Sequence, residues 1–145
     1  MPPAAPRKPD WPSRLAASIE SARKRRFAWG EHDCCLFACA CIAAMTGVDP
    51  ARGFRGRYRN RRGALRALRR RAGGGLAETV AALAARHGYA EIAPLKAGRG
   101  DLVLLTGRGA GPDGLGICVG RAALVATPEG LQAITPQAWQ RAWKI

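Results

Sequence analysis

The stretch FAWGEHDCCLFACACIAAMTG, from Phe27 to Gly47, holds four of the five cysteines of the chain and one of its two histidines. Asp33 is a residue type that caps helix N-termini, and Gly47 is the type that ends helices in a left-handed conformation. The apolar run between them predicts a helix over residues 33–46. This helix carries most of the sulfur in the chain, which suits a metal site, a nucleophile or a buried core.

The four cysteines of this helix fall on two faces. With about 100° of rotation per residue, Cys34 and Cys41 lie within about 20° of each other, whereas Cys35 and Cys39 lie on a second face. One helix therefore cannot direct all four sulfur atoms at a single ion, and the paired, short-spaced ligands of a structural zinc site are missing. We expect no cofactor. The alternative is an iron–sulfur or zinc site shared with a partner chain through Cys34, Cys35, Cys39 and Cys41.

Cys34 differs from the other three cysteines because it lies in the first turn of the helix. There the helix dipole and the unpaired backbone amides stabilise a thiolate. Free cysteine elsewhere packs as a small apolar residue, so we expect Cys35, Cys39 and Cys41 to be buried in the core. Cys34 is the candidate nucleophile.

Further helices are predicted on both sides of this one. Residues 1–9 are rich in proline and predict an N-terminal arm that is flexible or docked on a partner. A helix should begin at Asp10, with Leu15 and Ile19 on its inner face. Two more helices are predicted over residues 64–71 and 76–87, after an irregular loop over residues 50–62.

The second half of the chain predicts strands. The runs DLVLL, LGICVG, ALVAT and LQAIT are rich in β-forming residues and are separated by Gly, Pro and Asp, which predicts one antiparallel sheet. The loop TGRGAGPDG joins the first two runs. The C-terminal TPQAWQRAWKI predicts a last helix, capped by Thr135 and anchored by Trp139 and Trp143. Helices followed by strands predict an α+β fold, with N-terminal helices packed on a small antiparallel sheet.

Positive charge is concentrated in the first half of the chain. Residues 1–72 hold 17 Lys and Arg against 5 Asp and Glu, and ten arginines fall within residues 52–71. We interpret residues 50–72 as an arginine-rich insertion in a single domain over residues 10–145. The insertion is also a basic docking surface for a polyanion or an acidic partner. Its candidate binding residues are Arg52, Arg55, Arg57, Arg59, Arg61, Arg62 and Tyr58.

Two patterns, WGEHDCCLF and GRGDLVLL followed by GLGICVG, resemble the NlpC-type papain-like cysteine peptidases, which cleave peptidoglycan peptides. The matching positions are Trp29-Gly30 for the connector, Asp33-Cys34 for the nucleophile pair, Gly100-Asp101 for the start of one strand and residues 116–120 for the next. The resemblance covers about residues 27–121. It implies a papain-like fold with Cys34 as the nucleophile.

The chain departs from that family at the general base. The resemblance places the base at the start of the second strand, where this chain has Gly114. A papain-like mechanism needs an imidazole within hydrogen-bond reach of the thiol, so His32 is the candidate base. Asp33 and Asp101 are further candidate catalytic residues, Asp101 as the group that orients a base. The alternatives are a loop-shaping hydrogen bond for His32 and a turn before the strand for Asp101.

Three functions are consistent with these features. Small proteins with WGxHDCC, GFRGRY and a terminal AW look like a group from phage and prophage tail modules, which implies a structural tail-tip or hub protein with a degenerate or atypical peptidase fold. The second hypothesis is an active peptidoglycan endopeptidase with Cys34 as nucleophile. The third is a basic nucleic-acid-binding protein that uses Phe54 and Tyr58 as stacking groups.

The partners and location follow from the first hypothesis. Other tail-tip or hub proteins are the expected partners, with peptidoglycan and a weak contact with DNA as further ones. The start of the chain does not have the pattern of a signal peptide, and no window is long enough to cross a bilayer. We therefore expect synthesis in the bacterial cytoplasm, localisation in the virion and no membrane insertion.

Overall fold

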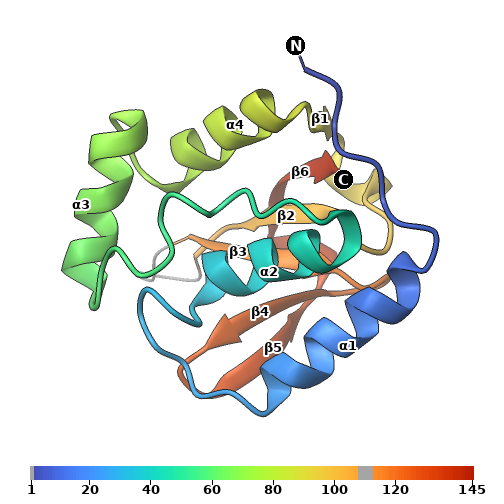
Figure 1. Ribbon diagram of the computed structural model, residues 1–145, viewed down its shortest axis with the longest axis horizontal. Coiled ribbons are helices and arrows are strands. Elements are labelled where there is room, and N and C mark those ends of the chain that lie inside the picture. The colour runs from blue at the N-terminus through green and yellow to red at the C-terminus, as the bar shows by residue number, and fades with distance from the viewer. Residues whose placement is uncertain (1, 108–112) are drawn as a thin grey trace.

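The structure has an α+β fold in which the helices come first in the chain and the strands second, as predicted. In the computed structural model, which describes residues 2–107 and 113–145, four α-helices precede six strands (Figure 1). The helices are α1 (Trp11–Arg23), α2 (Cys34–Thr46), α3 (Arg61–Ala72) and α4 (Leu76–His87). The strands are β1 (Ala90–Ile92), β2 (Leu102–Leu105), β3 (Gly114–Cys118), β4 (Ala123–Thr127), β5 (Gly130–Ile134) and β6 (Trp139–Lys144). The middle of the predicted loop between β2 and β3 lies outside the described residues.

The six strands form one sheet in the order β1-β6-β2-β3-β4-β5, and every neighbouring pair is antiparallel. One face of the sheet is covered by helices: α2 crosses β3 and β4, while α1 lies against α2 and β5 (Figure 1). The main hydrophobic core fills this interface, with Leu15 of α1, Phe37 and Met45 of α2, and Ile117 and Trp143 of the sheet all buried. A smaller cluster lies on the other face and includes Val103, Cys118, Val125 and Trp139.

Both N-terminal helices form where the sequence predicts them. α1 buries Leu15 and Ile19, as expected. Asp10 occupies the N-cap position, but its carboxylate accepts a hydrogen bond from Arg14 Nε at 2.7 Å and does not cap the helix. α2 is apolar on every side because it lies between α1 and the sheet, and it ends at Gly47, whose φ of 84° is left-handed.

The arginine-rich segment forms a loop and then a helix. α3 begins at Arg61, three residues earlier than predicted, because the Asn60 side chain accepts a hydrogen bond from the Gly63 amide and caps the helix. No residue of α3 is fully buried. α4 packs beside α3 and buries Val80 in the main core, and it ends at Gly88 as predicted.

The prediction of a C-terminal helix is wrong. Thr135 and Pro136 start only a single 3-10 turn, after which β6 inserts between β1 and β2. The spacing of Trp139 and Trp143 does not place them on one face either. A bulge skips Gln140, so Trp139 joins the smaller cluster and Trp143 the main core on the opposite face. The backbone hydrogen bonds of two strands outweigh the helical preference of this short segment.

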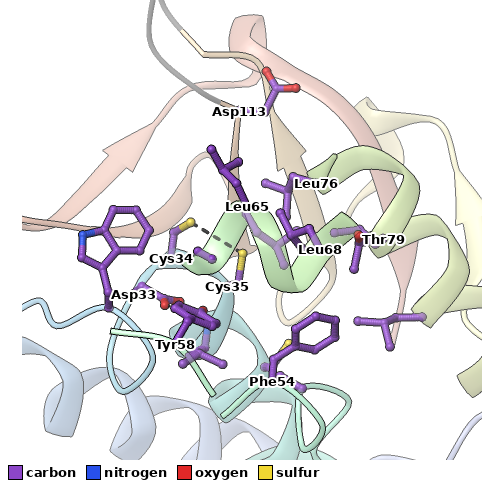
Figure 2. A pocket seen from close by; sticks show the side chains of 18 of the residues that line it. Asp33, Cys34, Cys35, Phe54, Tyr58, Leu65, Leu68, Leu76, Thr79 and Asp113 are labelled. Carbon is purple, nitrogen blue, oxygen red and sulfur yellow. Dashed lines mark hydrogen bonds between the residues drawn. The ribbon is translucent and has the colours of Figure 1, made fainter. Parts of the chain in front are cut away.

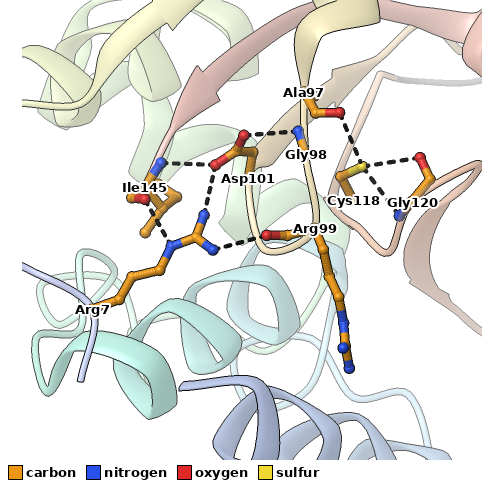
Figure 3. A network of polar contacts seen from close by, with 8 residues as sticks. All are labelled: Arg7, Ala97, Gly98, Arg99, Asp101, Cys118, Gly120 and Ile145. Atoms are coloured by element: carbon orange, nitrogen blue, oxygen red, sulfur yellow. Dashed lines mark hydrogen bonds and ion pairs between the residues drawn. The ribbon is translucent and has the colours of Figure 1, made fainter. Parts of the chain in front are cut away.

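The N-terminal arm is docked on its own chain. The Arg7 guanidinium donates to the Asp101 carboxylate, the Arg99 carbonyl and the Ile145 carbonyl, each at 2.8 Å (Figure 3). The Lys8 amide donates to the Met45 carbonyl at 2.7 Å. The arm over residues 2–9, which the sequence predicts to be flexible or docked on a partner, lies against α2 and the C-terminus of its own chain, because the buried Asp101 carboxylate needs a partner for its charge.

Candidate functional site

A tight connector delivers the chain to the start of α2. The amide of Ala28 donates to the His32 carbonyl at 3.0 Å, and the His32 amide donates back to Ala28 at 2.8 Å. Gly30 between them has a φ of 82°, and a Cβ on it would collide with the Tyr58 carbonyl oxygen. Only glycine fits this position, which explains the Trp-Gly step before the helix.

Asp33 fixes the first turn of α2. Its carboxylate is buried and accepts hydrogen bonds from the Leu36 amide at 2.9 Å, the Gly30 amide at 3.1 Å and the Tyr58 hydroxyl at 2.5 Å. Burial and this carboxylate raise the pKa of the Tyr58 hydroxyl far above its usual value. Asp33 therefore caps the helix and ties it to the arginine-rich loop, a structural role that occupies the whole carboxylate.

Two adjacent thiols begin the helix. The sulfur atoms of Cys34 and Cys35 lie 3.8 Å apart on the wall of a cavity (Figure 2). The pKa of Cys34 is lowered mainly by its hydrogen bond with the Cys35 thiol, and this effect outweighs burial. The same hydrogen bond and burial raise the pKa of Cys35. As the pH rises, Cys34 therefore loses its proton at a lower pH than Cys35.

The cavity beside the thiols has a volume of about 230 Å³ and is mostly apolar. Leu65 and Leu68 of α3 and Leu76 of α4 gather above the two sulfur atoms, and Phe54 closes one side (Figure 2). The leucines of α3 line this cavity and do not contribute to the main core. A ligand group that enters this cavity and reaches the thiols is therefore more favourably apolar than charged.

Gly114, where the resemblance expects the base, begins β3 beside the thiol. A Cβ on Gly114 would meet Val125 at 3.7 Å, an ordinary contact. Val125 belongs to the smaller cluster, against which Cys34 also packs. The next residue, Leu115, lines the same cavity as Cys34. The start of β3 is therefore close to Cys34, and the residue there has no side chain.

Neither histidine of the chain lines the cavity that holds Cys34. His32 is buried in a different hollow, between α1 and α2, where its ring meets Phe37 edge-on with 6.1 Å between centroids. Burial there lowers the pKa of His32. His87 stacks on Tyr89 at 5.7 Å between centroids. The structure does not bring the candidate base to the candidate nucleophile.

Asp101 lies at the other end of β3 from Cys34. Its carbonyl accepts the Cys118 amide, whereas Cys34 lies near Leu115. The buried carboxylate binds Arg7 and the backbone amides of Gly98 and Ile145 (Figure 3). Asp101 thus holds the two ends of the chain together and is not placed to orient a base at Cys34.

The other cysteines are divided between packing and the cavity. Cys39 and Cys41 are buried as predicted, and burial raises the pKa of Cys41 to about 11. Cys35 is partly buried: it packs against the main core, as predicted, and it also lines the cavity. Within residues 2–107 and 113–145, no three His, Cys, Asp or Glu side chains are grouped so as to hold a metal ion.

A protein-family model matches residues 6–145. The chain belongs to the DUF6950 family. The description of this family is a domain of unknown function, and its span begins in the arm, so the Arg7 contacts are part of the family domain. The sequence matches none of the curated proteins with which it was compared.

The predicted binding residues separate into structural and exposed groups. Arg55 pairs with Asp49 at 2.9 Å, and the Tyr58 hydroxyl is bound to Asp33. Phe54 is buried beneath the Arg71 guanidinium, so it is not a free stacking group. The exposed side chains are Arg52, Arg57, Arg59, Arg61 and Arg62.

Sequence reasoning missed the residues that depend on α3 and α4. In the sequence, Leu65 and Leu68 look like ordinary apolar positions, and Arg66 and Arg70 are not among the predicted binding residues. The signal that could have found them is the amphipathic pattern of α3, with leucines on one side and arginines on the other.

Proposed function

We propose that this protein is a tail-tip component of a phage or prophage, built on an NlpC-type papain-like domain that has lost its general base and serves a structural role. This proposal rests on two positions taken together: Cys34 at the position of the nucleophile and Gly114 at the position of the base. The thiol keeps the helix start of a nucleophile, while the strand position that would supply the imidazole is a glycine. Removing a general base typically costs about 10²–10⁴-fold in rate.

The cavity supports the same conclusion. A peptidoglycan peptide carries amides and charged groups, which need polar partners when they are buried. Leucine is the commonest residue in the wall beside Cys34, and the polar lining, which includes Arg61 and Asp113, is the smaller part of its surface. This lining suits a packed structural element better than a cleft for a polar peptide.

The location in a virion and the tail-tip partners rest on the sequence resemblance. Among residues 2–107 and 113–145, no helix has the length and hydropathy of a bilayer-crossing segment.

The loss of activity is tested with the purified full-length chain and isolated peptidoglycan, with released fragments identified by mass spectrometry. We expect no release above that of a Cys34→Ala variant. Fragments that appear with the natural chain and vanish with Cys34→Ala would overturn the structural role and support an active endopeptidase.

The papain-like ancestry is tested by Gly114→His. The space around Gly114 accepts a Cβ, so the variant should fold. An imidazole there should pair with Cys34 and shift its pH profile of iodoacetamide alkylation to lower pH, because the ion pair favours the thiolate. Gly114→Ala is the matched control for the added Cβ. Identical profiles for the histidine and alanine variants would show that the start of β3 is not the position of the base.

A further inference from the structure

A third hollow, of about 300 Å³, lies on the other side of α3 from the thiols. We call it the arginine groove. Its lining residues are Arg57, Tyr58, Arg59, Asn60, Arg62, Gly63, Arg66, Ala67 and Arg70. Five of these nine residues are arginines, and none is acidic.

The five guanidinium groups of the groove are available to a ligand. All five side chains are exposed, and within the described residues none forms an ion pair. Their neighbours Arg55 and Arg71 differ, because Arg55 is held by Asp49 and Arg71 donates to the Gly53 carbonyl at 2.7 Å. Unpaired like charges in one hollow repel each other, which a bound anion would relieve.

The arginines are spaced regularly. Arg62, Arg66 and Arg70 are four residues apart, so they share one face of α3 and follow each other at about 6 Å along its axis. The loop residues Arg57 and Arg59 line the same hollow before the helix begins. The amino end of α3 adds the positive end of its dipole to this field. The groove therefore presents a row of cations of the kind that follows a chain of repeating anions.

The loop and the helix are held in fixed relation. The Tyr58 hydroxyl is bound to Asp33, which anchors the loop to the start of α2. A Cβ on Gly63 would lie 3.1 Å from the Tyr58 Cβ, so α3 packs closely on this tyrosine. The groove is thus preorganised, and binding does not have to order the loop.

We infer that the arginine groove binds the phosphate backbone of a nucleic acid without reading its bases. Arginine pairs with phosphate through a planar fork of donors, and regular spacing matches a repeating phosphate chain better than scattered carboxylates. A membrane surface is disfavoured because an amphipathic helix binds lipid with its apolar face, and both leucines of α3, the exposed Leu65 and the half-buried Leu68, line the thiol cavity on the side of the helix away from the groove. This inference is independent of any chemistry at Cys34.

The test is the fluorescence anisotropy of a labelled oligothymidylate of about 16 nucleotides, the upper end of single-strand site sizes. The full chain is titrated at salt concentrations from about 50 to 200 mM. The variant Arg62→Gln/Arg66→Gln/Arg70→Gln should bind at least tenfold more weakly. Its slope of log K against log salt should fall by about 2, since each phosphate contact on a single strand contributes about 0.7.

The matched control removes three exposed cations that directly follow α1, as Lys24→Gln/Arg25→Gln/Arg26→Gln. It changes net charge by the same amount and should leave affinity within about threefold, since these side chains do not line the groove and exposed charges farther away are screened by salt. Circular dichroism checks that both variants are folded.

Three results would overturn the inference. The first is equal loss of affinity in the groove variant and the control, which would mean that net charge alone drives binding. The second is no measurable binding of the oligonucleotide by the natural chain. The third is groove-dependent binding to poly-glutamate or to vesicles of anionic phospholipid that is as tight as binding to the oligonucleotide, which would identify another class of partner.

Discussion

Replacing Asp33 by alanine should destabilise the fold more than it changes the reactivity of the neighbouring thiol. The carboxylate is buried and accepts three hydrogen bonds, from the Leu36 amide, the Gly30 amide and the Tyr58 hydroxyl. The alanine variant leaves all three donors without their partner inside the protein. A catalytic residue would instead be free to face a substrate.

The expected magnitude follows from these contacts. Loss of an N-cap costs about 0.5–2 kcal/mol. Hydrogen bonds to a charged group are each worth about 1.5–3 kcal/mol, and the three bonds are coupled through one carboxylate, so they do not add fully. We expect Asp33→Ala to lower the free energy of unfolding by about 3–5 kcal/mol, a large share of the roughly 5–15 kcal/mol of a typical domain. Tyr58→Phe removes one of these bonds to the charged carboxylate and should cost about 1.5–3 kcal/mol.

The assay is urea unfolding followed by tryptophan fluorescence, with Asp33→Asn as the control that keeps the side-chain oxygen for the cap. The double variant Asp33→Ala/Tyr58→Phe should cost less than the sum of the two single variants, because the hydroxyl no longer has a partner to lose. A cost below about 1 kcal/mol for Asp33→Ala, the lower range of a single cap, would refute the structural role. So would an Asp33→Asn variant of unchanged stability whose Cys34 has lost its reactivity.

Two further predictions concern the thiol pair and the contacts of the arm. Cys35→Ala removes the donor that lowers the pKa of Cys34, so the pH midpoint of Cys34 alkylation by iodoacetamide should move upward; an unchanged midpoint would show that the backbone amides alone set it. Asp101→Ala leaves Arg7 and two backbone amides without their acceptor and should cost about 3–5 kcal/mol in thermal unfolding, while Arg7→Gln should cost less because the amides still bind the carboxylate. A larger loss for Arg7→Gln than for Asp101→Ala would contradict that order.

The sequence predicts the helix around Cys34 well because its signals are local. An Asp at the N-cap, an apolar run and a Gly at the end act within a few residues, and the structure has all three. The same holds for β2 to β5, where turn residues separate β-rich runs. The candidate nucleophile follows from this local pattern, since the first turn of a helix is defined as soon as its cap is known.

Local sequence patterns could not predict which side chains lie beside Cys34. His32 is two residues from Cys34 in the chain, yet the connector turns its ring toward α1. Asp101 directly precedes β2, which pairs with β3, yet it lies beside Cys118 at the opposite end of β3 from Cys34. Closeness in sequence or in strand order does not fix side-chain direction, which depends on how the helix and sheet pack.

The sequence by itself determined the α+β order of elements, the cap and end of α2, and the concentration of arginines between residues 52 and 71. Only the tertiary structure decided that the last segment is a strand, because its backbone hydrogen bonds come from β1 and β2, distant in the chain. Tertiary packing also divided α3 between two cavities, with leucines over the thiols and arginines in the groove. Local sequence patterns determine whether a segment forms a helix or a strand. Burial and strand pairing between distant segments determine which residues each face of that helix or strand contacts.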